Sequence, residues 1–320
     1  WARARRRPLK PVETGWNSWD YYSGAVSARV MRDNQRAAGA ALGTRLRTWV
    51  IDEGWEPRWG AWVPNWKFPD GLRTFCRETR ARGGRPGIWT APLLVNTYLD
   101  LFADRPDWFL RDAQGQIVQR RYTYGPMAFL DVTHPEAAAW LTAVFTRLRK
   151  AGFSYFKVDF TQEILAAAAW HDPTVPRGAL LNRAFRLIRR AIGPDAYLLA
   201  CGAPYESVTG LVDAVRVTGD IHHFWSHIRF NAGSLAARWW MHRRLWNVDP
   251  DFLIVRTAET CTLKRRYRPF TERPIHYDVA QYWTSGREMT LREARTLALL
   301  VYVSGGDLFL SDPIPSLNAE

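Results

Sequence analysis

The chain has 320 residues, 47% of them hydrophobic, and a formal net charge of +13. The hydrophobic content is ordinary for a globular protein with a sizeable core, and the apolar runs are too short to span a membrane. The basic residues are scattered except at residues 3–7 and 264–268, so the charge favours a solvated surface over a nucleic-acid partner.

Strands and helices are predicted to alternate along the whole chain. The β-type runs are residues 14–20, 47–52, 86–92, 155–160, 197–201, 214–217, 252–256 and 306–310. Helical patterns cover residues 27–41, 72–82, 134–151, 177–192, 233–245 and 290–303, and a small hairpin is expected at residues 116–124. In the clearest helix, residues 134–151, Thr133 is the expected N-cap and Pro135 stands in the first turn.

Eight strands with helical crossovers predict an α/β fold of the (β/α)8 TIM-barrel type, formed as a single domain. An open doubly wound sheet is the rival, but it would ordinarily carry a glycine-rich loop after its first strand, and residues 15–20 are not one. Little sequence follows residue 310, so we expect the eighth helix to be missing or truncated.

The run Tyr-Phe-Lys-Val-Asp-Phe at residues 155–160 is the most informative of these strands. Side chains alternate between the two faces of a strand, so Lys157 and Asp159 should share one face. Phe156, Val158 and Phe160 should form the buried face. The lysine charge favours an ionised Asp159, which could be a nucleophile, although a structural ion pair at a strand end is the alternative.

Polar residues collect at the ends of several predicted strands. They are Asp20, Asp52 with Glu53, Lys157 with Asp159, Cys201, and Arg216 with Asp220. Because the carboxyl ends of barrel strands meet at one mouth, these side chains should gather there. Tryptophans beside polar residues, such as Trp16, Trp19 and Trp55, offer flat apolar faces that suit sugar rings.

Two aspartates on separate strands, without a metal cluster, a Ser–His pair or a phosphate loop, suggest glycoside hydrolysis. Asp159 is the better nucleophile, and apolar neighbours should raise the pKa of Asp220 and keep it protonated as a general acid. A retaining enzyme would hold the two carboxyls roughly 5–5.5 Å apart, an inverting one roughly 6.5–9.5 Å.

Cys76, Cys201 and Cys261 are odd in number and far apart, so neither a disulfide framework nor a metal-ligand spacing is present. We therefore expect no metal and no cofactor, and the cysteine usage favours a reducing, cytoplasmic compartment. The chain starts at Trp1 without an apolar signal segment, so we expect a fragment or excised domain.

The chain resembles the retaining α-galactosidases of glycoside hydrolase families 27 and 36, more closely the bacterial family 36 melibiases. The resemblance runs from residue 15 to residue 312 and depends on nine motifs in order. They are GWNSWD, VIDEGW, FPDGL, RPGIWTAP, LDVTHPEA, YFKVDF, CGAP, VDAVRVTGD and NVDPD.

The resemblance implies Asp159 as nucleophile, Asp220 as acid/base and an exo-acting enzyme that removes terminal α-linked galactose. Around the sugar it implies Lys157 at the ring hydroxyls, and Asp52 and Glu53 at the 4- and 6-hydroxyls. Arg216 and Cys201 would lie on the C2 side, with Asp251 as a further contact. The walls of the sugar site would be Trp16, Trp19 and Trp55. The substrates would be small or oligosaccharide α-galactosides, with no nucleic-acid or membrane partner, and the oligomeric state stays open.

Departures from the family keep alternatives open. Many relatives carry Asp-Asp where this chain has Asp52-Glu53, and the extra methylene reaches toward the C6 group, which makes a β-L-arabinopyranoside a rival substrate. Gly202 could leave room for the acetamido group of an α-N-acetylgalactosaminide. A catalytically inactive carbohydrate-binding barrel is the alternative of another class. The family usually adds β-sandwich domains, whereas we expect residues 1–320 to form the barrel alone.

Overall fold

Nine short strands form one parallel sheet in the computed structural model, which describes residues 8–43, 45–122, 124–264, 266 and 287–318. In sheet order they are β10 (Asn247–Asp249), β9 (Ala214–Arg216), β8 (Tyr197–Ala200), β7 (Tyr155–Val158), β3 (Arg85–Thr90), β2 (Thr48–Ile51), β1 (Thr14–Asn17), β12 (Leu308–Leu310) and β11 (Phe252–Leu253).

The sheet closes into a barrel through residues 247–253. β10 pairs with β9 on one side, and β11, only two residues further along the chain, pairs with β12 on the other. The amide of Asp307 also donates to the carbonyl of Val248 at 2.9 Å. β10 and β11 are therefore one barrel strand interrupted at Pro250 and Asp251, and the predicted (β/α)8 barrel is confirmed. The predicted seventh strand, residues 252–256, begins five residues too late.

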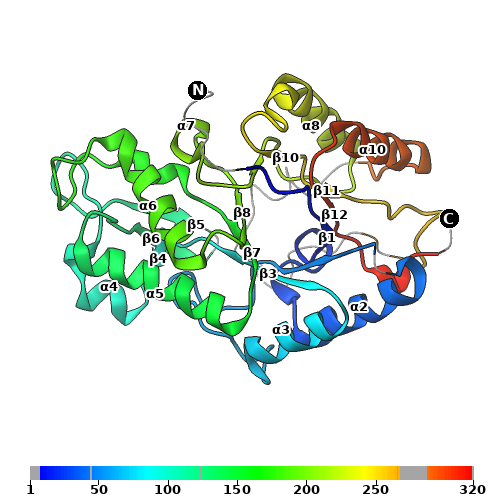
Figure 1. Cartoon of the computed structure of the whole chain (residues 1–320), viewed down its shortest axis with the longest axis horizontal. Helices are drawn as coiled ribbons and strands as arrows, with labels where there is room; N and C mark the ends of the chain where they lie inside the picture. The colour runs from blue at the N-terminus through cyan, green and yellow to red at the C-terminus, as the bar shows by residue number, and fades with distance from the viewer. Residues whose placement is uncertain (1–7, 44, 123, 265, 267–286, 319–320) are drawn as a thin grey trace.

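Helices surround this barrel (Figure 1). The longer ones are α2 (Ala28–Leu42), α3 (Gly71–Ala81), α5 (Pro135–Ala151), α6 (Arg177–Ile192), α8 (Trp225–Arg238) and α10 (Leu291–Ser304). Single turns are α1 (Trp19–Tyr22), α4 (Asp100–Asp104) and α7 (Tyr205–Val208). The helix predicted at residues 233–245 exists but was placed too late: α8 ends at Arg238, and it starts at Trp225 after a cap, Phe224, that makes no side-chain capping bond.

Local capping explains several helix ends. The Ser27 hydroxyl accepts from the Val30 amide at 3.2 Å, and Thr290 and Glu293 form a capping box at the start of α10. Thr133 does not cap α5, because its hydroxyl donates to Asp131 at 2.7 Å. The Nδ1 atom of His134 caps that helix instead by accepting from the Glu136 amide.

A small antiparallel sheet lies outside the barrel, next to α4, α5 and α6 in Figure 1. It consists of β4 (Leu94–Asn96), β6 (Gly125–Phe129) and β5 (Gln119–Tyr122). Thus the hairpin predicted at residues 116–124 exists but extends to Phe129. After β12 the described residues contain only a 3-10 turn at Ile314–Ser316, in line with the expected lack of an eighth helix there.

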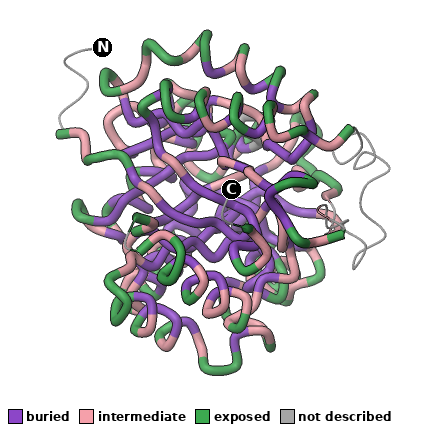
Figure 2. Tube along the Cα trace, turned by 90° about the vertical axis from the view of Figure 1, so that its right-hand side faces the viewer, coloured by how far each residue is buried: buried purple, intermediate pink, exposed green. Residues whose placement is uncertain are grey.

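Alternation along the strands divides the core into two parts. Tyr155 packs inside the barrel, stacked on Tyr197 with ring centroids 5.3 Å apart, whereas Phe156 and Val158 pack outward against the helices. In Figure 2 the buried segments run through the middle of the molecule and the exposed ones lie on the outer turns. No described helix is long and apolar enough to cross a membrane. The basic run at residues 3–7 and most of that at 264–268 lie outside the described residues.

Candidate active site

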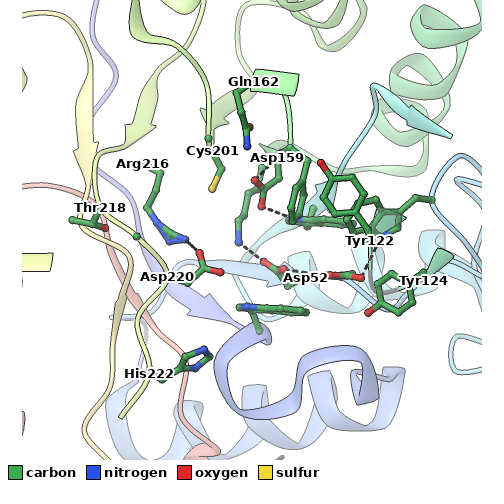
Figure 3. A pocket seen from close by; sticks show the side chains of 18 residues that line it. Asp52, Tyr122, Tyr124, Asp159, Gln162, Cys201, Arg216, Thr218, Asp220 and His222 are labelled. Carbon is green, nitrogen blue, oxygen red and sulfur yellow. Dashed lines mark hydrogen bonds and ion pairs between the residues drawn. The ribbon is translucent and has the colours of Figure 1, made fainter. Parts of the chain in front are cut away.

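A cavity of about 380 Å³ opens at the C-terminal ends of the barrel strands (Figure 3). Its volume lies within the range of small-molecule sites. It is lined by Trp19, Asp52, Glu53, Trp59, Trp89, Tyr122, Tyr124, Lys157, Asp159, Phe160, Gln162, Cys201, Gly202, Arg216, Thr218, Gly219, Asp220 and His222. Eight of the eleven site residues expected from the sequence are among them.

Asp159 follows the last residue of β7 and points into the cavity. Its carboxylate accepts hydrogen bonds from the Trp89 indole at 3.1 Å and from the Phe160 amide at 2.8 Å. Phe160 has a φ of 53°, which turns it away from the strand and onto the cavity wall. The expectation that Phe160 continues the buried face of the strand was therefore wrong.

Lys157 pairs with Asp52 across the barrel mouth rather than with Asp159. The ammonium lies 2.8 Å from Oδ2 of Asp52, which also accepts from the Asn17 amide group at 2.8 Å. Both side chains are buried. Burial lowers the pKa of Lys157, but the nearby Asp52, Cys201 and Asp159 outweigh it and raise the pKa above its ordinary value.

Glu53 lies next to Asp52 but makes a different contact. Its Oε1 atom accepts a hydrogen bond from the Trp59 indole at 3.1 Å. The Trp59 ring in turn packs against Tyr122, Tyr124 and Phe160, with centroid distances of 5.5, 5.8 and 4.8 Å. Consequently, one side of the cavity is an aromatic wall that holds the Glu53 carboxylate.

Arg216 and Asp220 meet on the opposite side of the cavity (Figure 3). Nη2 of Arg216 donates to Oδ1 of Asp220 at 2.7 Å, and the Asp220 side chain is 45% exposed. Burial raises the pKa of Asp220, but Arg216, Lys157 and His222 outweigh it, so the pKa lies below its ordinary value. The expectation of a raised pKa was wrong because the arginine four residues earlier outweighs the apolar neighbours.

Asp251 lies behind Arg216 and does not line the cavity. Its carboxylate pairs with Nη1 of Arg216 and accepts from the Ile221 amide at 2.7 Å. Burial raises the pKa of Asp251 to about 7, although Arg216 opposes that rise. Asp251 therefore supports Arg216 and the chain directly after Asp220.

Trp16 and Trp55 do not line the cavity either. Both are fully buried, and their indole groups donate to the carbonyls of Asp312 and Trp89. Trp19, in contrast, lies on the cavity wall. Cys201 also lines it, and burial raises the pKa of its thiol well above the ordinary value.

Sequence reasoning missed Trp59, Trp89, Tyr122, Tyr124, Gln162 and His222 as cavity residues. Three of them, Trp59, Tyr124 and His222, stand on loops, where no periodic pattern indicates which way a side chain points. Trp89 could have been predicted from the sequence, because it lies inside a predicted strand within one of the nine motifs. Among the described residues no group of three or more His, Cys, Asp or Glu side chains could hold a metal ion, and the cysteines there are free.

Comparisons with known proteins support the fold and indicate the family. The profile of the melibiase family matches residues 17–179. The α-galactosidase of Escherichia coli is 28% identical over 236 residues, which cover 70% of this chain and 31% of that protein. The chain spans under a third of the length of the first curated relatives it matches.

Two solved structures cover 99% of the chain. An α-galactosidase from Thermus thermophilus in complex with p-nitrophenyl α-D-galactopyranoside matches with a TM-score of 0.78 and 27% identity over 61% of its own length. A β-L-arabinopyranosidase from Geobacillus stearothermophilus matches with a TM-score of 0.66 over 74% of its length, but at 15% identity this likeness shows the fold alone.

A (β/α)8 barrel with several carboxylates around a cavity at its C-terminal mouth is an arrangement that glycoside hydrolases use, and the relatives and solved structures that this chain matches are glycosidases. Within the class, the chain belongs to the melibiase family.

Proposed function

We propose that the chain is the catalytic barrel of an exo-acting retaining α-galactosidase, with Asp159 as the nucleophile and Asp220 as the acid/base. The observation that carries the proposal is that both carboxylates line one cavity at the C-terminal mouth of the barrel. Membership of the melibiase family, and similarity to α-galactosidases over most of the chain, support galactose as the sugar that is removed.

In the first step Asp159 attacks the anomeric carbon while Asp220 gives its proton to the glycosidic oxygen. The bond between the anomeric carbon and that oxygen breaks, and the sugar becomes bonded to Asp159. In the second step Asp220 takes a proton from a water molecule, whose oxygen attacks the same carbon and releases Asp159. The hydrogen bonds from Trp89 and Phe160 hold the attacking carboxylate in place, which favours reaction by limiting its motion.

The state of Asp220 in the free enzyme suits the second step better than the first. Its pairing with Arg216 favours the ionised form, whereas the first step needs a protonated carboxyl. We infer that bound substrate weakens the contact between Arg216 and Asp220, so that the carboxyl takes up its proton only in the complex.

The galactose ring would occupy the space between Asp52 and Cys201. Asp52 and Glu53 would accept hydrogen bonds from the 4- and 6-hydroxyls, and Lys157 would donate to the ring hydroxyls. Arg216 and Cys201 would lie on the C2 side, and Trp19 would offer an apolar face. Each of these side chains lines the cavity.

Two alternative substrates would use the same site. Trp59 holds Glu53, which is one methylene longer than aspartate, so less room is left for a C6 group; a β-L-arabinopyranoside has none. An α-N-acetylgalactosaminide would need space beside Gly202, where the end of the Gln162 side chain would lie 2.8 Å from an added Cβ atom and would have to move. Aryl glycosides of the three sugars, compared by kcat/KM, separate these possibilities.

Replacement of Asp159 by Ala tests the mechanism. We expect hydrolysis of p-nitrophenyl α-galactoside to fall by about 10³-fold or more, because the nucleophile is lost. Added azide should restore turnover and yield the β-galactosyl azide, since the small anion fits where the carboxylate was removed. Exposed Asp195 provides the matched control, and Asp195→Ala should keep wild-type activity.

An unchanged rate in Asp159→Ala would refute the assigned nucleophile, and an α-configured azide product would refute the double displacement. If the wild-type chain binds galactose in calorimetry but hydrolyses no aryl glycoside, an inactive carbohydrate-binding barrel is the better description.

A further inference from the structure

A buried pair, Asp20 and His222, reaches the cavity from the side of the acid/base and has no part in the mechanism above. Asp20 lies in α1, where its carboxylate contacts the guanidinium of Arg256 and its amide donates to the Ser311 hydroxyl at 3.0 Å. Burial raises the pKa of Asp20, but Arg256 and His222 outweigh it and hold the pKa well below its ordinary value. Asp20 is therefore ionised and can only accept hydrogen bonds.

That ionised carboxylate fixes the imidazole of His222. Nδ1 of His222 lies 2.5 Å from Oδ1 of Asp20, so Nδ1 must bear the hydrogen and donate it. The ring lines the cavity, and within the described part of the chain Nε2 has no hydrogen-bond partner. Burial lowers the pKa of His222, but the bond to Asp20 and its charge outweigh it and raise the pKa, which favours a hydrogen on Nε2 as well.

The position of His222 relates it to the leaving group. It follows Asp220 by two residues, and in Figure 3 it lies on the far side of Asp220 from Cys201 and Gln162. Under the proposed function Asp220 protonates the oxygen of the leaving group, so the leaving group lies beside Asp220 and near the residues that follow it. Of the side chains assigned to the galactose ring, Asp52 follows β2 and Lys157 lies in β7, whereas Arg216 ends β9, the strand that leads to Asp220 and His222.

We propose that His222 is a substrate-contacting residue, positioned by Asp20, whose Nε2 atom donates a hydrogen bond to a hydroxyl oxygen of a sugar leaving group. This inference rests on the proposed function and adds to it a residue that contacts the leaving group. A leaving group without hydroxyls gives Nε2 no acceptor, so the contact distinguishes sugar leaving groups from simple alkyl ones.

Two substrates with similar chemistry test the contact. Melibiose and methyl α-galactoside both have alkoxide leaving groups that need protonation, but only melibiose has a second sugar ring. In His222→Asn the amide can still donate to Asp20, but it is too short to replace Nε2. We expect this variant to lose about tenfold or more in kcat/KM for melibiose and less than about threefold for methyl α-galactoside.

His222→Gln serves as the rescue variant, because its longer amide places a donor near the position of Nε2. We expect it to recover part of the lost preference for melibiose. His171 is an exposed histidine away from the cavity, and His171→Asn should leave the ratio of the two substrates unchanged. Circular dichroism checks that each variant is folded.

If the His222 variants do not fold, the imidazole signals of His222 can be followed by NMR in Asp159→Ala, which binds without turnover. Melibiose should shift the Nε2 signal and methyl α-galactoside should not. Equal losses for both substrates in His222→Asn, or equal NMR shifts, overturn this inference while the proposed function stands. If the wild-type chain hydrolyses neither substrate, the proposed function fails and takes this inference with it.

Discussion

The buried pair of Lys157 and Asp52 permits a quantitative test of how the cavity is built. Its ammonium and carboxylate lie 2.8 Å apart with side chains only 5% and 2% exposed. Removing one partner of a buried pair leaves an uncompensated charge and costs about 3–5 kcal/mol, whereas replacing both partners costs much less. Lys157→Met and Asp52→Asn should therefore each be strongly destabilising, and the double variant should be more stable than their sum implies.

The expected coupling energy is about 2–4 kcal/mol, because each single change incurs most of the cost of an unpaired buried charge. The pKa of Lys157 is raised in the folded state, so this stabilisation is fully present below the ordinary lysine pKa and is lost only as pH rises through the raised value. Urea unfolding at pH 7 thus measures the pair with Lys157 fully charged, provided that the m-values stay constant.

Arg105 and Glu136 form the matched control on the surface. Their charged atoms lie 2.7 Å apart, but the side chains are 45% and 55% exposed. The same double-mutant cycle with Arg105→Met and Glu136→Gln should give about 0.2–1 kcal/mol. A coupling energy for Lys157 and Asp52 no larger than this would refute the reasoning from burial.

Two further predictions concern stability. Burial and the charge of Glu53 raise the pKa of Glu56 from 4.5 to about 8. The contribution of the Glu56 carboxyl to the free energy of unfolding is therefore fully present below pH 4.5 and is lost as pH rises through 8. Glu56→Gln should therefore gain about 3–5 kcal/mol relative to wild type between pH 5 and pH 9 in urea unfolding, and an equal difference at both pH values would contradict this. Gly15→Ala would place a Cβ atom 2.2 Å from the Thr48 carbonyl and should cost about 3 kcal/mol or more in thermal unfolding. Gly39→Ala, in a helix with open space around it, should gain about 0.5–1 kcal/mol, and equal effects of the two changes would count against the packing argument.

The alternation of side chains was enough to predict where Lys157 and Asp159 point, because both lie on or next to a regular strand. The same rule failed one residue later, where Phe160 takes a positive φ. The seventh strand was misplaced because Pro250 interrupts it, so its first half did not show a continuous β pattern. Motifs and periodicity identify elements well, but irregular backbone at strand ends decides which side chains enter the cavity.

The tryptophans show a second limit. Trp16, Trp19 and Trp55 have similar polar neighbours in sequence, but only Trp19 lines the cavity. Which face of a strand or loop is covered by helices is a property of the complete barrel, and local composition does not contain it. The pKa of Asp220 was misjudged for a related reason, because its sign depends on a specific contact with Arg216 rather than on the average polarity of the neighbourhood.

The pairing of β1 with both β2 and β12 has a consequence for how the chain folds. β1 and β12 are about 290 residues apart in the sequence. Neither strand can therefore pair with a neighbouring strand on both of its edges until nearly the whole chain has been made. Loss of residues 305–310 would open two strand edges at once, on β1 and on β11, and open edges recruit other chains. Truncation at this end should therefore lead to aggregation rather than to a smaller folded barrel.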